Sequence, residues 1–307
     1  MKFCDKISML GFYRQKSGGF MPNTQTDIFR TISATDNEKF KKIVIEVMSE
    51  ACSADLSDEQ YDGIGTLGEK QMHAALKRFI CPDRTKHEVK LFGSYGHIKT
   101  PDESTQSKRK FVADILSDDT VYEIQTGNFS PLCEKIHWIL ENTSYNVTVI
   151  HPIAESLKIS YIDSESGKIG PFKRSPHHGR LEEIASELYF FRDFITSKRF
   201  SLIIMMMEAN QYRKKIPQKN GRRTRSAKYE MIPSSLLGAY FFCNADDYNI
   251  FIPQSLPEIF TVQTYSKEAK IYGMDAYSIV KTLCHVGLLE QCGKIGRAVA
   301  YKRKTQS

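Results

Sequence analysis

The stretch that decides the fold is residues 111–126, FVADILSDDTVYEIQT, in which two β-rich runs flank a polar turn. The turn formers at residues 117–120 predict a tight hairpin. Counting outward from the turn places Leu116 opposite Val121. The sequence therefore predicts two antiparallel strands in one defined register.

The same register places two acids face to face, Asp114 and Glu123. Side chains two residues apart on a strand share a face, so Gln125 lies beside them. Like charges at opposed positions destabilise a hairpin unless a cation or a proton lies between them. A divalent metal site on this face is the favoured interpretation, and the alternative is a solvated face of an edge hairpin.

Size and charge limit the class of protein. The chain has 307 residues, 41% of them hydrophobic and 11% aromatic, which suits a soluble protein of about two domains. The net charge is +7 and the isoelectric point about 8.9, with Lys and Arg gathered in clusters. Clustered positive charge favours a polyanionic partner, and nucleic acid is the leading candidate.

The longest strongly apolar run, residues 200–207, is far shorter than the roughly 20 residues that cross a bilayer. A signal-peptide core is absent from the N-terminal sequence, so we expect a cytoplasmic protein without membrane contact. The seven cysteines form no Cys-x-x-Cys pair and are expected to be reduced thiols without a structural metal.

Two helices are predicted before the hairpin. Asp36 is expected to cap a helix over residues 37–52 with one apolar stripe. This stripe is interpreted as core, and a partner or homodimer contact is the alternative. In a second helix, over residues 69–80, Glu69 lies on the side of the apolar stripe and is expected to face inward. Alternatively, Glu69 only complements the positive end of the helix dipole.

A parallel strand pair is predicted after the hairpin. Ser130 is expected to cap a helix with Pro131 in its first position. The Val- and Ile-rich run of residues 145–152 then reads as a buried strand. Its relation to residues 121–126, strand, helix, strand, predicts a parallel pair with a right-handed crossover.

This ordered set resembles the PD-(D/E)XK nuclease superfamily. The residues that carry the resemblance are Glu69 on an early helix, Asp114 on a strand, and Glu123-Ile-Gln125 on its hairpin partner. The resemblance covers roughly residues 62–165 and implies a restriction-endonuclease-like α/β/α core with a mixed sheet. The usual Glu-x-Lys is here Glu-x-Gln, a variant that some restriction endonucleases of similar pattern also carry.

The resemblance implies phosphodiester hydrolysis with Mg²⁺, for which Mn²⁺ can substitute. Asp114 and Glu123 would hold the metal, with Glu69 as an additional ligand, because hard cations prefer carboxylate oxygens. Gln125 would orient the attacking water through its amide but cannot supply a positive charge. Lys135, on the helix after the hairpin, is a candidate substitute cation, and the alternative is a solvated lysine.

The densest charge run lies at residues 213–228, which contain no acidic residue. It is expected to be a flexible basic segment that contacts the DNA backbone through Arg222, Arg223 and Arg225, and a solvated linker is the alternative.

Residues 233–307 resemble a winged helix, a module that binds DNA or other proteins. Its exposed face is predicted to carry Tyr277, Ser278, Lys281, Thr282 and His285, and its wing Lys294 and Arg297.

The expected division is an N-terminal helical region at 1–61, a nuclease-like core at 62–232 and the winged helix at 233–307. The function predicted is a metal-dependent DNA endonuclease, which would fit restriction, defence or mobile-element biology. A nuclease-fold DNA-binding regulator without activity and a protein-interaction factor are the alternatives.

Overall fold

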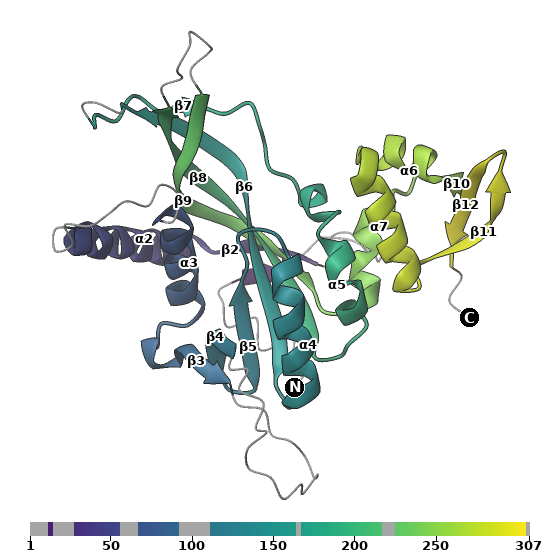
Figure 1. Cartoon of the computed structure of the whole chain (residues 1–307), viewed down its shortest axis with the longest axis horizontal. Coiled ribbons are helices and arrows are strands. Elements are labelled where there is room, and N and C mark those ends of the chain that lie inside the picture. The colour runs from purple at the N-terminus through teal and green to yellow at the C-terminus, as the bar shows by residue number, and fades with distance from the viewer. Residues whose placement is uncertain are drawn as a thin grey trace, which may run out of the picture.

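The structure, a computed structural model, describes residues 12–14, 28–55, 67–91, 111–163, 167–216 and 225–304. A mixed β-sheet with helices on both faces forms its centre, and a small module of helices and strands follows it (Figure 1). The strand order is β1-β2-β9-β8-β6-β5-β4-β3, with β7 paired to β6 off this path. The strand bounds are Phe12–Arg14, Phe29–Ile32, His87–Leu91, Phe111–Ser117, Thr120–Ile124, Asn146–Ile162, Lys173–Arg174, Phe200–Ile216 and Arg225–Phe242 for β1 to β9.

The middle of the sheet is parallel. β5 pairs with β6 and β6 with β8 in parallel, whereas the other pairs of this sheet are antiparallel. The chain passes from β5 through α4 (Cys133–Asn142) to β6, so the predicted strand, helix, strand unit is confirmed. β6 is longer than expected, because residues 146–162 form one strand.

One face of the sheet is covered by α2 (Ala34–Asp55) and α3 (Leu67–Ile80). Phe40, Met72 and Leu76 are buried between these helices and the sheet, which confirms the core interpretation of the stripes. The cap of α2 differs from the prediction. The Ser33 hydroxyl accepts the Asp36 backbone N–H at 3.0 Å, so Ser33 caps the helix and Asp36 lies inside it.

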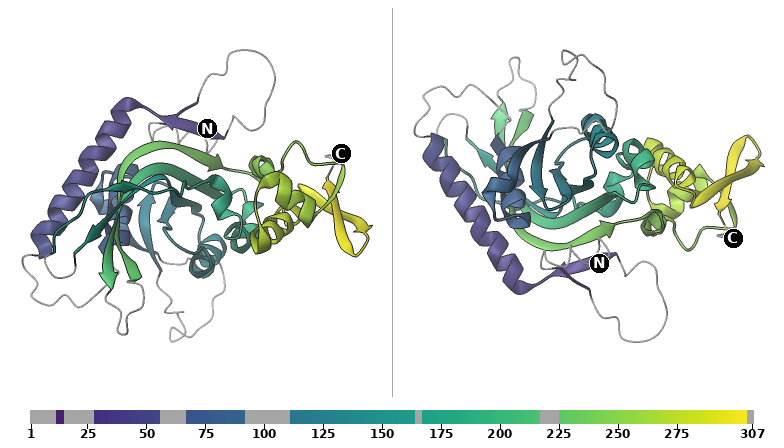
Figure 2. Two further views of the ribbon diagram at one scale, coloured as in Figure 1. Left: turned by 90° about the horizontal axis from the view of Figure 1, so that it is seen from above. Right: turned by 90° about the horizontal axis from the view of Figure 1, so that it is seen from below.

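The opposite face is covered by α4, α5 (Leu188–Ile195) and two 3₁₀ turns, η4 (Ser130–Leu132) and η5 (Leu181–Ile184) (Figure 2). Ser130 is not a side-chain cap, because it is the first residue of the 3₁₀ turn that precedes α4 and Phe129 occupies the cap position. The α/β class with a mixed sheet between helical layers is therefore confirmed.

The C-terminal module has the winged-helix order of elements. Its elements are the 3₁₀ turn η6 (Ala245–Phe251), β10 (Ile259–Thr261), α6 (Val262–Ala269), α7 (Gly273–His285), β11 (Leu289–Ile295) and β12 (Ala298–Arg303). The three strands form a separate antiparallel sheet in the order β10-β12-β11. In the described residues, no helix is both long enough and apolar enough to span a membrane.

The prediction of a flexible basic segment at residues 213–228 is wrong at both ends of the segment, where the residues belong to strands. Residues 213–216 belong to β8 and residues 225–228 to β9, and the two strands pair along their length. The Arg213 guanidinium donates to the Ser226 carbonyl at 3.2 Å, and Lys214 Nζ lies 4.0 Å from the Tyr229 ring centroid. Long basic side chains can thus line a strand by pairing with groups on the neighbouring strand. β9 also crosses residues 232 and 233, where the sequence predicted a domain boundary.

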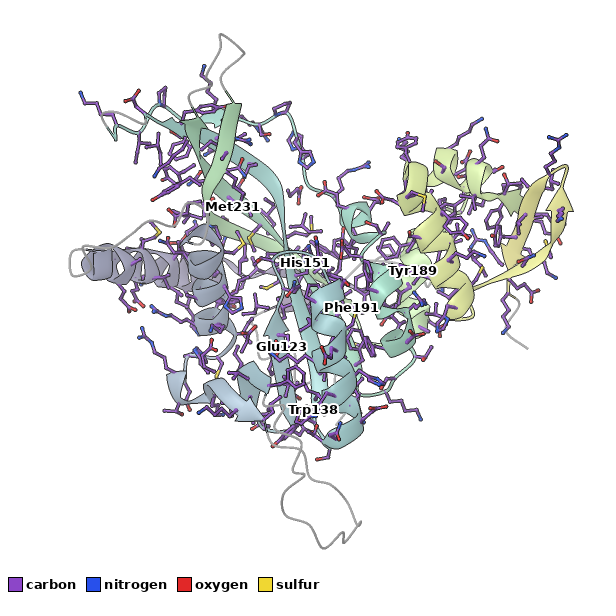
Figure 3. All side chains as sticks on the ribbon, viewed as in Figure 1. Glu123, Trp138, His151, Tyr189, Phe191 and Met231 are labelled. Atoms are coloured by element: carbon purple, nitrogen blue, oxygen red, sulfur yellow. The ribbon has the colours of Figure 1, made fainter. Side chains whose placement is uncertain are left out.

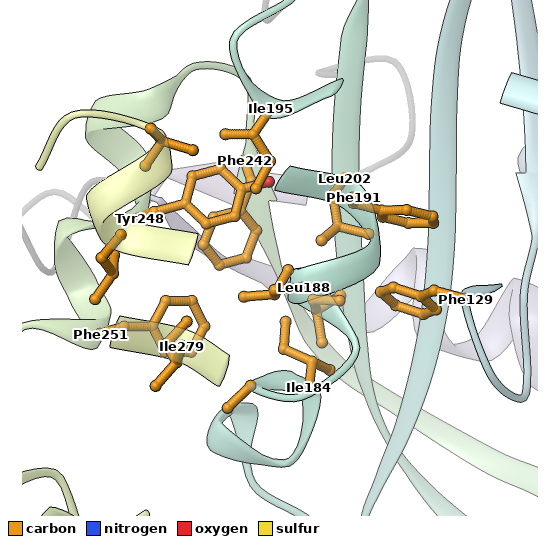
Figure 4. Packing of buried hydrophobic residues seen from close by; sticks show 14 of the residues in the cluster. Phe129, Ile184, Leu188, Phe191, Ile195, Leu202, Phe242, Tyr248, Phe251 and Ile279 are labelled. Carbon is orange, nitrogen blue, oxygen red and sulfur yellow. The ribbon is translucent and has the colours of Figure 1, made fainter. Parts of the chain in front are cut away.

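A single apolar cluster joins the sheet to the C-terminal module (Figure 4). Phe242 at the end of β9 packs on Tyr248 of η6, with ring centroids 4.7 Å apart. Leu188 of α5 and Ile279 of α7 are both fully buried in this cluster. Because their apolar surfaces are buried together, the module and the α/β core should unfold as one unit.

This shared core gives a prediction for Ile279. Ile279→Ala is expected to lower the free energy of unfolding by about 2–5 kcal/mol, the usual range for a buried Ile. The fluorescence of Trp138, the single tryptophan of the chain and part of the α4 layer, should report the same shift. Met274→Ala is the control on α7, because this side chain is 73% exposed. A module that unfolded alone, leaving the Trp138 transition unchanged, would contradict the shared core.

Candidate active site

The hairpin of β4 and β5 has the predicted register. Leu116 pairs with Val121, and Asp118 takes the left-handed conformation (φ 54°) in the turn. The backbone pairing ends at Ile115 and Tyr122, one residue before Asp114 and Glu123 would meet. Beyond this point, the Asp114 side chain takes the place of a backbone partner on β4 and accepts a hydrogen bond from β5.

Asp114 fills part of this gap between the strands. Its Oδ2 accepts the Ile124 backbone N–H at 2.8 Å and lies 3.0 Å from Nε2 of His73 on α3. Burial raises the pKa of Asp114, but His73, Ile124 and the charge of Lys135 outweigh burial, and the pKa lies below its ordinary value. Asp114 is therefore held as a carboxylate.

Glu123 is buried from the other side of the hairpin. Its side chain is 5% exposed, and its Oε2 forms an ion pair with Nζ of Lys135 on α4. The same Nζ donates to the Val112 carbonyl at 2.6 Å. The second oxygen, Oε1, is buried and accepts no hydrogen bond.

The electrostatic environment of Glu123 differs from that of Asp114. Burial raises the pKa of Glu123 to about 7, the Asp114 charge adds to this rise, and Lys135 opposes it. Asp114 and Glu123 are thus close enough to repel, as the register predicted. A cation placed between them would relieve both the repulsion and the desolvation of Glu123.

The structure brings Asp114, Glu123 and Lys135 together and places Gln125 differently from the prediction. The Gln125 side-chain amide donates to the Asn128 carbonyl in the following loop. Glu69 lies in α3, but its side chain is outside the described residues. His73, four residues later on α3, was not predicted as a site residue. Its helical spacing from Glu69 could have indicated that it faces the hairpin.

The donor groups fit a hard divalent cation. Asp114 and Glu123 offer carboxylate oxygens from adjoining strands, and the partnerless Oε1 of Glu123 is an acceptor that a metal would satisfy. Among the described side chains, no cluster of three potential ligands is present. Two carboxylates and water are a common ligand set for Mg²⁺, which retains several waters.

The predicted DNA-binding residues are placed in part. Arg222 and Arg223 lie outside the described residues, and Arg225 begins β9 with its side chain undescribed. On the C-terminal module, the exposed residues are Tyr277, Lys294 and Arg297, and the partly buried ones are Ser278 and Lys281.

One expectation for the exposed face of α7, that for Thr282, needs correction. Thr282 is fully buried, and its hydroxyl donates to the Ser278 carbonyl at 3.0 Å. His285 is exposed but lies 3.0 Å from the Asp193 carboxylate of α5. The reason is that α7 packs on α5, which the sequence of α7 alone does not reveal. Thr282 is therefore not available on an exposed face as predicted, whereas His285 is exposed as predicted.

Comparisons with known proteins include the β4–β5 hairpin and the strands of the sheet that follow it, whereas β1, β2 and β3 precede the family match. A family match covers residues 95–243. It is a domain of unknown function, DUF8091, and it includes Asp114, Glu123 and Lys135 and ends one residue after β9. An uncharacterized protein of Treponema pallidum (strain Nichols) is 24% identical over 244 residues, 78% of this chain and 88% of that protein. No solved structure gives a significant match.

The buried Glu123 predicts a pH dependence of stability without metal. Its pKa of about 7 exceeds the ordinary 4.5, so the folded state binds more protons than the unfolded state between these values. Stability contributed by this group is therefore present below about pH 4.5 and falls as the pH rises through about 7. Relative to Glu123→Gln, the wild-type free energy of unfolding should fall by about 3 kcal/mol over this range.

Chemical denaturation at several pH values in the presence of a chelator measures this difference. Glu258→Gln, at an exposed position on the C-terminal module, is the matched control and should follow wild type. A constant difference between wild type and Glu123→Gln at all pH values would contradict the buried environment of Glu123.

Proposed function

We propose that this chain is a metal-dependent endonuclease that hydrolyses phosphodiester bonds in DNA. The observation that carries the proposal is the buried acid pair, in which Glu123 Oε1 has no hydrogen-bond partner and Asp114 adds a second carboxylate. The arrangement is similar to the PD-(D/E)XK nucleases, in which acids of one hairpin hold the metal. It supports a restriction-endonuclease-like core with a Glu-x-Gln site.

In this proposal Asp114 and Glu123 hold Mg²⁺, with Glu69 as an additional ligand. A bound Mg²⁺ lowers the pKa of a coordinated water and offsets the negative charge that develops on the scissile phosphate. The protein's own contribution is to keep both carboxylates in place before metal arrives. The Ile124 N–H and His73 fix Asp114, and Lys135 fixes one oxygen of Glu123.

Lys135 supports the proposal as the substitute cation. Its ammonium group contacts Glu123 directly, from α4 instead of from the position of Gln125. The Lys135 side chain is only 15% exposed, so its charge acts in a poorly screened environment. The alternative of a fully solvated lysine does not agree with these contacts.

DNA is proposed as the substrate because of the positive charge of the chain, +7, and its basic clusters. Lys294 at the end of β11 and Arg297 in the adjoining turn are exposed on the wing of the C-terminal module. With Tyr277 and Lys281 they form the surface proposed to contact the DNA backbone. The shared core would hold this surface at a fixed position relative to the acid pair.

A second candidate is a DNA-binding regulator that keeps the nuclease fold without activity. Gln125 favours it, because the side chain at the usual lysine position is neutral and bonds to Asn128. The two candidates differ in cleavage and not in DNA binding, so one assay separates them.

The assay is cleavage of supercoiled and linear DNA with Mg²⁺ or Mn²⁺. Asp114→Asn is expected to reduce the rate by at least about 100-fold, because a neutral amide is a poorer ligand and leaves the metal site short of charge. Asp118→Asn is the matched control, since it changes an acid in the turn of the same hairpin and should cut as wild type does. DNA binding by both variants should remain.

Wild-type protein that binds DNA but cuts with neither ion would overturn the endonuclease proposal and favour the inactive regulator. Equal cleavage by wild type and Asp114→Asn would place any nuclease activity elsewhere in the chain.

A further inference from the structure

His151 lies on β6 where the pairing between β5 and β6 ends. The Gln125 N–H donates to the Ile150 carbonyl at 2.9 Å, which continues the parallel ladder. The next bond would run from the N–H of residue 152 to the Gln125 carbonyl, but residue 152 is proline and has no N–H. His151 Nδ1 donates to this carbonyl instead, at 2.6 Å.

His151 shares a face of the sheet with Glu123. Ile124 pairs with Ile150, so the same register sets Gln125 beside His151. Side chains alternate along a strand, which puts Glu123, Gln125 and His151 on the face that α4 and α5 cover. Figure 3 shows Glu123 and His151 near the middle of this face, with Phe191 of α5 beside them. Paired strands are about 4.8 Å apart, so His151 directly neighbours the position where similar nucleases carry lysine.

The imidazole ring is held in one orientation. Phe129 meets it edge-on, with ring centroids 5.1 Å apart, and stacks on Phe191 at 4.4 Å. The Phe129 N–H in turn donates to the Glu187 carboxylate at 2.7 Å. Phe129 is thus held by Phe191 and Glu187, and its contact with the imidazole fixes the ring of His151 beside Gln125.

The bond to Gln125 also fixes the tautomer. A carbonyl oxygen only accepts, so Nδ1 must carry the proton, and in the neutral ring Nε2 carries the lone pair. Burial lowers the pKa of His151, which favours the neutral ring. Within the described residues, Nε2 has no hydrogen-bond partner. The face of the sheet that carries Glu123 therefore holds a proton acceptor that the sequence did not single out.

We propose that His151 Nε2 accepts the proton of the attacking water, which neither the amide of Gln125 nor the ammonium of Lys135 can do. This inference rests on the proposed nuclease function and adds a catalytic residue to it. In the step, one O–H bond of the water breaks and its proton passes to Nε2. The water oxygen bonds to phosphorus, the bond from phosphorus to the leaving strand oxygen breaks, and that oxygen takes a proton from a second water. His151 then returns its proton to the hydroxide so formed.

An anchoring role for His151 makes a different prediction from a catalytic one. In His151→Asn, the side-chain amide nitrogen lies where Nδ1 lies and can still donate to the Gln125 carbonyl, whereas the lone pair of Nε2 is lost. Anchoring alone would therefore survive this substitution. Proton transfer by a positioned side chain contributes about 10²–10⁴-fold to a rate. If His151 is catalytic, the substitution should therefore lower the cleavage rate even though the anchoring bond remains.

The experiment measures single-turnover cleavage of supercoiled DNA by the full chain with Mg²⁺ and with Mn²⁺. The cleavage rate of His151→Asn should be at least about 100-fold below that of wild type, at equal thermal stability and equal DNA affinity. His178→Asn is the matched control, because His178 Nδ1 also bonds a backbone carbonyl, that of Glu155, at 3.2 Å on an exposed loop. The control should cut at the wild-type rate.

The outcomes separate the two proposals. Wild-type cleavage with His151→Asn within about threefold of it would overturn the role of His151 and leave the nuclease proposal standing. No cleavage by wild type with either ion would overturn both.

Discussion

The buried ion pair between the Glu123 carboxylate and Lys135 is the interaction on which the rest of the site depends. A buried charge without a partner is strongly destabilising, and Lys135 reaches one oxygen of Glu123 from α4 and forms an ion pair with it. The backbone pairing of β4 with β5 ends next to this carboxylate. The Asp114 side chain satisfies the Ile124 N–H of β5, which has no backbone partner on β4. The unsatisfied oxygen and the nearby Asp114 charge are electrostatically unfavourable, and a bound cation would compensate both.

The sheet and its apolar cluster hold this arrangement in place. β5, β6 and β8 are paired in parallel behind the site, and α4 and α5 cover the same face as Glu123. The cluster continues through Phe242 and Tyr248 into the C-terminal module, so the winged-helix elements form part of the same core. A surface on that module would thus be positioned by packing and not by a flexible linker.

Local patterns in the sequence predicted the centre of the fold well. The alternation of residues 111–126 set the hairpin register, and the helix between two apolar runs set the parallel pair. Contacts between distant elements were harder to predict. Lys135 was predicted as a candidate cation with a solvated lysine as the alternative, and only the packing of α4 shows its contact with Glu123. Thr282 was predicted to be exposed, but it is buried where α7 packs on α5. The bond from His151 to the Gln125 carbonyl takes the place of the one that Pro152 cannot make, and this signal is visible in the sequence only once the register of β6 is known.

Binding of Mn²⁺ to the metal-free protein, followed by electron paramagnetic resonance, tests the central claim most directly, because it needs neither a substrate nor activity. The account predicts that wild type binds Mn²⁺ and that Glu123→Gln binds it at least about 10-fold more weakly, since the buried carboxylate is a ligand. Asp118→Asn, in the turn of the same hairpin, should bind as wild type does. Equal Mn²⁺ affinity of wild type and Glu123→Gln would contradict a metal site at the acid pair.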